Sequence, residues 1–414
     1  MSYNKTILGG HFVISFDSVI NGFLAVVMAP VFFGGASDNQ IIQLLSSYAA
    51  YAALFVTGPL GAITFGRMGD KFGRKNTLLL SIIGIGVPVL VIGLLPPCSV
   101  IGIVAPLALI LLRMMQGFFK GVEYAGVLIH SYETGKKRIS SSAGIISFGC
   151  IGGSVAAVIC WFVTMDPTRH WAWRLPYVIG GFLALILFLF RMKIPETDEF
   201  IEISTGSKIL KSPLKDLFTN NKMEALVSVA VSALYTAFAY SSMIFGNRLF
   251  QQAGYTISQS MIFSAVDLLW ISTSIAICGK IADRIGLVKQ MKYGAMILIV
   301  TTIPVCSLIA GELTLTKIYS YMFINTFLSA TIASCSAAYI LRLFPVHCRY
   351  TGFAITDSMG SILGGITPFM LLLLSSTFHS NFGCAVWLLT LTVPTFVLIC
   401  WTEKVRQLQD DRRN

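Results

Sequence analysis

Long apolar runs, separated by short clusters of charge, constrain this 414-residue chain more than any other feature. A helix needs about 20 apolar residues to cross a bilayer, and runs of that length recur along the whole sequence. Only 12% of the residues are charged while 55% are hydrophobic, so a water-soluble fold would expose large apolar areas. The sequence therefore predicts an all-α polytopic membrane protein.

The apolar runs form two groups of six. We expect membrane spans at residues 8–33, 40–66, 76–96, 103–131, 140–164, 172–194, 224–252, 258–282, 290–310, 315–343, 348–377 and 382–403. A polar stretch separates the two groups. The predicted organisation is an N-terminal six-helix domain at residues 1–194, a cytoplasmic linker at 195–223, and a C-terminal six-helix domain with a short cytoplasmic tail at 224–414.

The distribution of cations predicts which side of the membrane each loop faces. Thirty Lys and Arg stand against 19 Asp and Glu, for a net charge of +11. Twenty-four of the 30 lie in the two termini and the even-numbered loops, and we place Arg191 among these loop cations. Because cationic loops stay in the cytoplasm, both termini are predicted to be cytoplasmic. The bilayer then accounts for the charge, and no nucleic-acid partner is expected.

A glycine-rich motif recurs at the same place in each half. GRMGDKFGRK, at residues 66–75, follows the second predicted span, and a degenerate copy, GKIADRIG, occupies residues 279–286 after the eighth. Glycines allow a short turn, and an Asp can meet a helix N-terminus or an Arg. We interpret these loops as a conformational latch made of Gly66, Asp70, Gly73, Arg74, Asp283 and Arg284.

The GxxxDxxGRK pattern resembles the signature loop of the major facilitator superfamily, and its copy after the eighth span is similar to the duplicated halves of that family. This resemblance implies the major facilitator fold, with twelve transmembrane helices in two six-helix domains. Each domain would consist of two inverted three-helix repeats, around a central site that opens alternately to either side of the membrane.

Six further segments resemble the metabolite:proton symporter branch, which holds proline/betaine, citrate, 2-oxoglutarate and shikimate permeases. They are FD at residues 16–17, RMMQGFFKGVEY at 113–124, WAWRLP at 171–176, PET at 195–197, FPVHCR at 344–349 and GGITP at 364–368. The resemblance implies a secondary active transporter that imports a small carboxylate-bearing or zwitterionic metabolite, proline- or betaine-like, together with protons.

The same resemblance implies a bacterial inner-membrane location and a proton gradient, rather than a cofactor, as the driving force. We expect the protein to function as a monomer. One departure concerns Ile14, because the branch usually has Glu at this position. An exchanger or a uniporter of the same fold therefore stays open, as does a symporter of di- or tricarboxylates or other organic acids.

Seven ionisable residues remain within the predicted spans once the charges counted with the loops and span ends are set aside. A charge in hydrocarbon is costly and usually faces protein or a water-filled path, so each is a candidate for function. They are Asp17, Arg113, Lys120, Glu123, Arg248, Asp267 and Asp357. On the fourth span, Arg113, Gln116, Lys120 and Glu123 fall within about 80° of one helix face. Gly117 and Gly121 lie beside this face, where a neighbouring helix can approach closely.

Asp17 and Glu123 should lie at a similar depth, so we expect them to form one cluster with Lys120. Two carboxylates that share a cation differ in proton affinity, which proton coupling requires. We predict that Asp17 or Glu123 carries the proton and that Arg113 attracts a substrate carboxylate. A static buried ion network is the alternative interpretation.

Further predicted substrate-binding residues are Gln116, Lys120, Tyr124, Tyr240, Asn325 and Asp357. Arg248 and Asp267 lie near the outer ends of consecutive spans and are predicted to pair, either as an outer gate or as a structural contact. A zwitterion matches this mixture of charges better than a dicarboxylate, which would require more cations.

An enzyme is not indicated. The five His residues lack HExxH-type spacing, the nine Cys residues include no CxxC motif, and no glycine-rich phosphate loop is followed by Lys and Ser or Thr. We therefore predict no catalytic residues, no metal site and no ATP-driven pump. A membrane receptor without transport activity is the alternative from another class.

Overall fold

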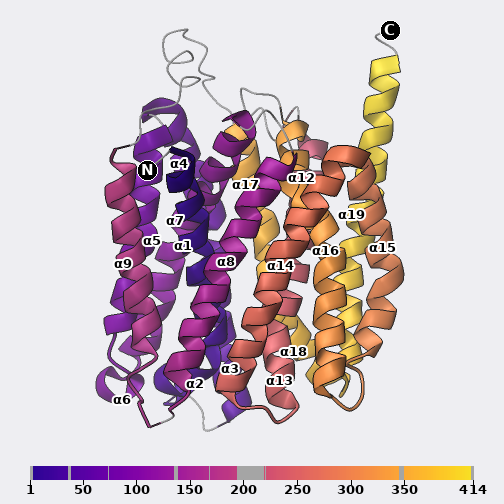
Figure 1. Ribbon diagram of the computed structural model, residues 1–414. Coiled ribbons are helices and arrows are strands. Elements are labelled where there is room, and N and C mark those ends of the chain that lie inside the picture. The colour runs from indigo at the N-terminus through magenta and orange to yellow at the C-terminus, as the bar shows by residue number, and fades with distance from the viewer. Residues whose placement is uncertain are drawn as a thin grey trace. The chain divides into compact units, whose positions relative to one another are not determined.

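The computed structural model describes residues 3–35, 39–72, 74–134, 139–166, 168–193, 219, 221–344 and 349–411, and the long elements among them are helices (Figure 1). Those of the first half are α1 (Tyr3–Phe23), α2 (Ala25–Phe33), α3 (Gln40–Val56), α4 (Gly58–Phe72), α5 (Arg74–Leu94), α6 (Cys98–Ile101), α7 (Val104–Thr134), α8 (Ile139–Thr164) and α9 (Arg174–Arg191).

The second half has the same character. Its elements are α12 (Lys222–Tyr240), the π-helix η1 (Ser241–Phe245), α13 (Gly246–Gln252), α14 (Ile257–Ile285), α15 (Leu287–Ser307), α16 (Leu315–Leu343), α17 (Arg349–Gly365), α18 (Thr367–Thr377), the short η3 (Asn381–Gly383) and α19 (Cys384–Asp411). Helices suit a bilayer because every backbone hydrogen bond is made within the segment.

Each of the twelve predicted spans coincides with helix. Within the described residues, ten helices are long and apolar enough to cross a membrane, and α1 with α2 makes an eleventh if that pair is one span. The 21-residue α15 occupies the ninth predicted span. The first span is not straight, however, because the chain bends by 61° between α1 and α2.

The chain divides into two compact units, which we call unit 1 and unit 2. Unit 1 comprises Met1–Val127, Phe148–Leu210 and Phe250–Leu269, and unit 2 comprises Leu128–Ser147, Lys211–Leu249 and Trp270–Asn414. In unit 1, α5 packs along α9; in unit 2, α12 packs along α17 and α15 along α16. The domain boundaries near residues 194 and 224 stay a prediction.

In unit 1, α7 approaches the α3–α4 segment so closely that only glycine fits at two points. A Cβ on Gly117 would lie 1.6 Å from the carbonyl oxygen of Leu54, and a Cβ on Gly61 would lie 1.6 Å from that of Phe118. Between them, Thr57 donates a hydrogen bond of 2.5 Å to the Met114 carbonyl. The expected close approach beside the polar face of α7 is therefore present at Gly117.

Candidate functional site

The polar face of α7 points into unit 1. Arg113 is 2% exposed, and Gln116 and Glu123 are fully buried. On the opposite side of the helix, Leu111 is 66% exposed and Met115 is 44% exposed, as expected for a face that contacts lipid. The spacing of the four polar residues therefore predicted the buried side of this helix correctly.

A chain of hydrogen bonds connects α7 to α1. Arg113 donates from Nη1 to Gln116 Oε1 over 3.1 Å, and Gln116 donates from Nε2 to Asp17 Oδ1 over 3.0 Å. Asn21, one turn along α1, donates to the same Asp17 oxygen over 3.1 Å. Asp17 thus accepts hydrogen bonds from two amide groups, and the Arg113 guanidinium donates to one of these amides, that of Gln116.

Arg113 is engaged on its other side as well. Its Nη2 donates to the Tyr177 hydroxyl of α9 over 3.1 Å, and the guanidinium carbon lies 5.5 Å from the centroid of that ring. The Tyr177 hydroxyl in turn lies 2.9 Å from the sulfur of Met28 in α2. Side chains of three helices, α7, α9 and α2, therefore contact one buried guanidinium, which orients the amide of Gln116 towards Asp17.

Lys120 differs from Arg113 because it is only half-buried. Its Nζ donates to Ser18 Oγ over 2.6 Å and lies 5.5 Å from the centroid of the Phe55 ring. A Lys ammonium has three donors, so one hydrogen bond to Ser18 leaves donor capacity for an anion. Among the four predicted residues on this face of α7, Lys120 is the cation best placed to meet a ligand.

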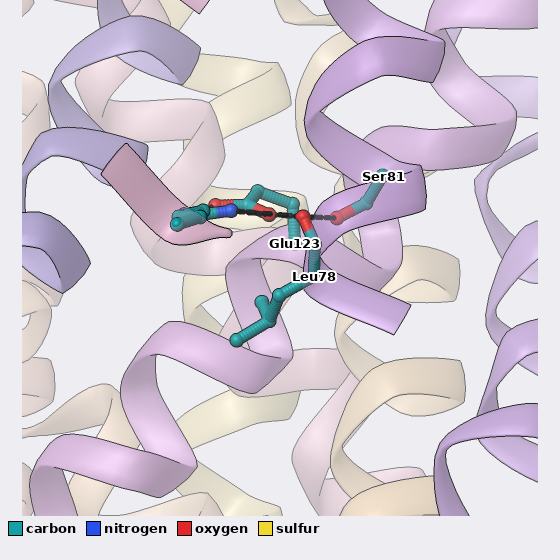
Figure 2. Close-up of polar contacts among 4 residues, drawn as sticks. Leu78, Ser81 and Glu123 are labelled. Atoms are coloured by element: carbon teal, nitrogen blue, oxygen red, sulfur yellow. Dashed lines mark hydrogen bonds and ion pairs between the residues drawn. The ribbon is translucent and has the colours of Figure 1, made fainter. Parts of the chain in front are cut away.

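Glu123 forms a buried ion pair with Arg191, in the last turn of α9. Arg191 Nη1 donates to Glu123 Oε2 over 2.6 Å, and Nη2 donates to the other carboxylate oxygen. Ser81 of α5 donates to Oε2 over 2.7 Å, and Arg191 also reaches the Leu78 carbonyl over 3.1 Å (Figure 2). A Cβ on Gly10 would lie 2.3 Å from Glu123 Oε1, so a larger residue where α1 crosses this pair would have to displace it.

The expected single cluster of Asp17, Lys120 and Glu123 is therefore correct only in part: Lys120 lies near enough to Asp17 to act on it electrostatically, whereas Glu123 is paired with Arg191. The structure instead has two networks, one around Asp17 and Arg113 and one around Glu123 and Arg191. The assignment of Arg191 to a cytoplasmic loop is also wrong, because its side chain is only 2% exposed. A bidentate Arg–carboxylate pair is a stronger partner for Glu123 than a single Lys ammonium.

The other predicted substrate-binding residues lie outside the hydrogen-bonded network of Asp17 and Arg113. Tyr124 of α7 packs its ring 5.2 Å from that of His11 in unit 1. In unit 2, Asn325 of α16 donates to the hydroxyls of Ser241 (3.0 Å) and Ser242 (2.7 Å) in the π-helix η1. Tyr240 is half-buried at the end of α12, directly before this π-helix.

Asp357 of α17 lies in unit 2 and is 6% exposed. It accepts hydrogen bonds from two α12 hydroxyls, Ser232 Oγ over 2.8 Å and Tyr235 OH over 2.9 Å. A carboxylate is therefore present inside each unit without a direct ion pair among the described residues, Asp17 in unit 1 and Asp357 in unit 2.

The latch residues are described in part. Asp283 Oδ1 accepts from the backbone N–H groups of Ile139 (2.9 Å) and Ser140 (3.4 Å), the first two residues of α8. This contact matches the expected meeting of an Asp with a helix N-terminus. Arg284, in the last turn of α14, is exposed. Gly73 lies outside the described residues, as do the side chains of Asp70 and Arg74, while Gly66 lies within α4.

The predicted pairing of Arg248 with Asp267 stays a prediction. Arg248 is half-buried in α13 within unit 2, whereas Asp267 is fully buried in α14 within unit 1. Because the structure describes each residue only within its own unit, it does not test this pairing.

Comparison with known proteins identifies the family. The sequence matches the Major Facilitator Superfamily over residues 7–368. The chain belongs to the major facilitator superfamily. It is therefore a multi-pass membrane transporter rather than an enzyme, with the superfamily's fold of two six-helix domains.

One similar member of the superfamily is the inner membrane metabolite transport protein YhjE of Escherichia coli K12. It is 26% identical over 408 residues, and the match covers 94% of this chain and 91% of that protein. The citrate-proton symporter of Salmonella typhi is 25% identical, and the match covers 87% of this chain and 84% of that protein. The proline/betaine transporter of Salmonella typhimurium is 26% identical, covering 85% and 73%. Two of these names, those of the citrate and the proline/betaine transporter, match permeases of the branch that the sequence motifs resemble.

Solved structures support the same fold. The major facilitator proton:xylose symporter XylE superposes with a TM-score of 0.76 over 96% of this chain and 94% of its own, at 12% sequence identity. At that identity, the likeness concerns the fold alone.

Sequence reasoning missed several residues of this transporter's polar networks. Arg191 carried a usable signal, because it falls inside the predicted span 172–194 and is therefore a charge within hydrocarbon. Asn21 also carried one, four residues after Asp17 and hence on the same helix face. Tyr177 and Ser81 carried none, since an aromatic or a hydroxyl residue in an apolar helix is ordinary until its neighbours are known.

Proposed function

We propose that this transporter imports a small carboxylate-bearing or zwitterionic metabolite, of the proline or betaine kind, together with protons by alternating access. The names of its relatives support this class of substrate, since they include a proline/betaine transporter and a citrate-proton symporter. They also support a bacterial inner-membrane location, because YhjE is an inner membrane protein.

The observation that carries the proposal is the arrangement of Asp17 and Lys120 on facing helices of unit 1. Within the described part of the chain, the hydrogen bonds that Asp17 accepts come from two amides, while Lys120, which donates to the adjacent Ser18, keeps spare donors and partial exposure. In our proposal, Lys120 receives the substrate carboxylate and Asp17 carries the proton. Arg113 orients Gln116 on Asp17 and adds positive potential to the site.

Glu123 takes a different role in this scheme. Its carboxylate is matched by a bidentate guanidinium and a hydroxyl, so protonation would leave the buried Arg191 charge uncompensated. We assign the Glu123–Arg191 pair to holding α5, α7 and α9 together, which corresponds to the static network considered from the sequence. Proton coupling then depends on Asp17 in unit 1.

Reconstitution into proteoliposomes tests the transport proposal. A panel of labelled proline, betaines, other amino acids and organic acids is offered with and without an inwardly directed proton gradient. We expect accumulation of a zwitterion that collapses with a protonophore and persists when sodium is absent. Failure of every solute in the panel to enter faster than into empty liposomes would contradict the proposal.

Two substitutions then test the roles within the site. Asp17→Asn should abolish gradient-driven accumulation and retain substrate counterflow, because the proton step is lost while binding remains. Lys120→Met keeps an unbranched side chain without the charge and should raise KM by about 10- to 100-fold, as expected for loss of a charged hydrogen bond of about 1.5–3 kcal/mol. The exposed Asp166→Asn variant, in the loop after α8, provides a matched control and should transport normally.

A symporter of di- or tricarboxylates is the second candidate, and the citrate-proton symporter relative favours it. Such a substrate requires several accessible cations. Among the described residues of the Asp17 network, Arg113 is buried and already donates to Gln116 and Tyr177, and Lys120 alone is accessible in part. Competition in the same assay decides the matter, because citrate would inhibit uptake of the zwitterion only if it entered this site.

A further inference from the structure

Asp357 lies in a seam of hydroxyl groups between α12 and α17. Ser232 and Tyr235, on one face of α12, donate to its carboxylate, and one residue earlier Thr356 meets Ser228 with 2.5 Å between the hydroxyl oxygens. The side chain of Asp357 is 6% exposed. The seam is thus polar and nearly closed to solvent.

At the seam, α12 and α17 lie so close together that their backbones cannot move to compensate for a change at Asp357. A Cβ on Gly360 would lie 2.5 Å from Ser232 Cβ, and a Cβ on Gly364 would lie 2.4 Å from Thr236 Cβ. Close contact of this kind keeps the Asp357 carboxyl at a defined distance from the α12 hydroxyls. Any change in its charge must therefore be met by hydroxyl rotation, by water or by a bound cation.

No cation among the described residues lies in contact with Asp357. The groups that act on it are the Ser232 and Tyr235 hydroxyls, of which Tyr235 is the titratable one. The neighbouring α18 contains no charged residue, while α16 carries Lys317 in its first turn and Arg342 in its last, where Arg342 pairs with Glu403 at 3.7 Å. Asp357 therefore differs from Glu123, which has its own guanidinium.

The hydrogen bonds are also uneven between the two carboxyl oxygens. Both hydroxyls donate to Oδ1, so within the described part of the chain Oδ2 has no hydrogen-bond donor. An ionised carboxylate in a low-dielectric interior is costly unless a counter-charge or full hydrogen bonding compensates it, whereas the protonated acid is not. Two donors on Oδ1 and an open Oδ2 suit a carboxyl group that binds a proton on Oδ2.

We propose that Asp357 is a second proton-binding site of this transporter, located in unit 2 and distinct from Asp17. The proton is taken up on Oδ2 when water reaches the seam and is released when water returns on the other side of the membrane. Ser232 and Tyr235 hold Oδ1 in both states, because their hydroxyls remain donors to it. This inference rests on the proposed proton coupling and assigns Asp357 to the proton rather than to the substrate.

Asp357→Asn tests the inference in proteoliposomes, because Asn keeps the size of the side chain and cannot bind the proton. We expect the variant to keep substrate counterflow with an unchanged KM and to lose the dependence of uptake on the proton gradient. Asp166→Asn is the matched control for removal of an acid. Retained gradient-driven accumulation in Asp357→Asn, with coupling intact in the unsubstituted protein, would overturn the inference.

Tyr235→Phe provides a second variant if Asp357→Asn folds poorly. Removal of one donor to Oδ1 favours the protonated carboxyl, so the pH at which uptake is half-maximal should move upward. Tyr293→Phe, on the exposed face of α15 in the same unit, is the matched control and should leave the pH profile unchanged. An unchanged pH profile in Tyr235→Phe would also overturn the inference.

Two further outcomes separate this inference from its alternatives. A raised KM for counterflow in Asp357→Asn would assign the carboxylate to a cationic group of the substrate. A sodium requirement that the unsubstituted protein shows and Asp357→Asn lacks would assign it to a metal cation. Either result overturns the proton site. If the unsubstituted protein shows no response to a proton gradient, the proposed function itself fails, whatever the variants do.

Discussion

At the scale of single residues, the partner that each buried charge finds determines what it can do. Glu123 and Asp17 are both carboxylates in apolar helices of unit 1, yet Glu123 receives a guanidinium and Asp17 receives two amides. An acid paired in two places with Arg supports structure, while an acid held by neutral donors has no ion pair for a proton to disrupt. The same distinction separates Glu123 from Asp357.

A double-mutant cycle on the Glu123–Arg191 pair tests its structural role. Glu123→Gln and Arg191→Gln should each lower the free energy of unfolding by about 3–5 kcal/mol, because each leaves an uncompensated buried charge. The double variant should recover a substantial part of that loss. Thermal unfolding in detergent measures all four proteins. Singles as stable as the unsubstituted protein, with only proton coupling altered, would instead return Glu123 to the role of proton carrier.

At the scale of elements, glycines decide how near two helices come, and end contacts decide how they are connected. α7 lies against α3 and α4 with backbone atoms in the place where a side chain would be, and α1 crosses the Glu123–Arg191 pair at Gly10. The N-terminus of α8 is capped by Asp283 of α14, so a residue of the second motif copy controls the end of a helix from the first half of the sequence.

Gly117→Ala should destabilise the protein because its methyl group would overlap the Leu54 carbonyl. The expected cost is about 1–3 kcal/mol, as for other overpacked cores. Gly144→Ala is the matched control, since a Cβ there meets nothing within 4 Å. The melting temperatures of the two variants in detergent provide the comparison. Equal melting temperatures would show that α7 and α3 separate without difficulty.

Asp283→Ala should remove the cap on α8 and cost about 0.5–2 kcal/mol of stability, whereas Asp283→Asn retains an acceptor oxygen and should cost less. Thermal unfolding measures the cap, and uptake rates measure its part in the proposed latch. If the cap opens during transport, Asp283→Ala changes the uptake rate more than Asp283→Asn does. Identical rates and stabilities for the two variants would exclude both effects.

At the scale of the whole molecule, the charge distribution predicts the orientation of the transporter in the membrane. Twenty-four of the 30 cations lie in the termini and the even-numbered loops on the predicted topology, although Arg191, counted with them, is buried inside unit 1. Removing one cation from that count leaves the asymmetry nearly unchanged, so the inference of cytoplasmic termini does not depend on it.

Reporter fusions test this orientation. Green fluorescent protein fused after residue 414 should fluoresce, because it folds in the cytoplasm. Alkaline phosphatase inserted after Gly311, in the loop between α15 and α16, should be active because that loop is predicted to face the outside. Exchange of the two reporters should silence both. The opposite pattern would reverse the predicted sidedness.

The class of fold, the positions of the spans and the inward face of α7 could all be predicted from the sequence alone. These features depend on apolar length and on helical periodicity, which are local properties of the chain. The family's motifs added the transporter fold. Only the tertiary structure decided which partner each buried charge meets, because Arg191 reaches Glu123 across 68 positions and Tyr235 reaches Asp357 across 122. Such pairings follow from how helices distant in sequence pack together, and no local pattern encodes them.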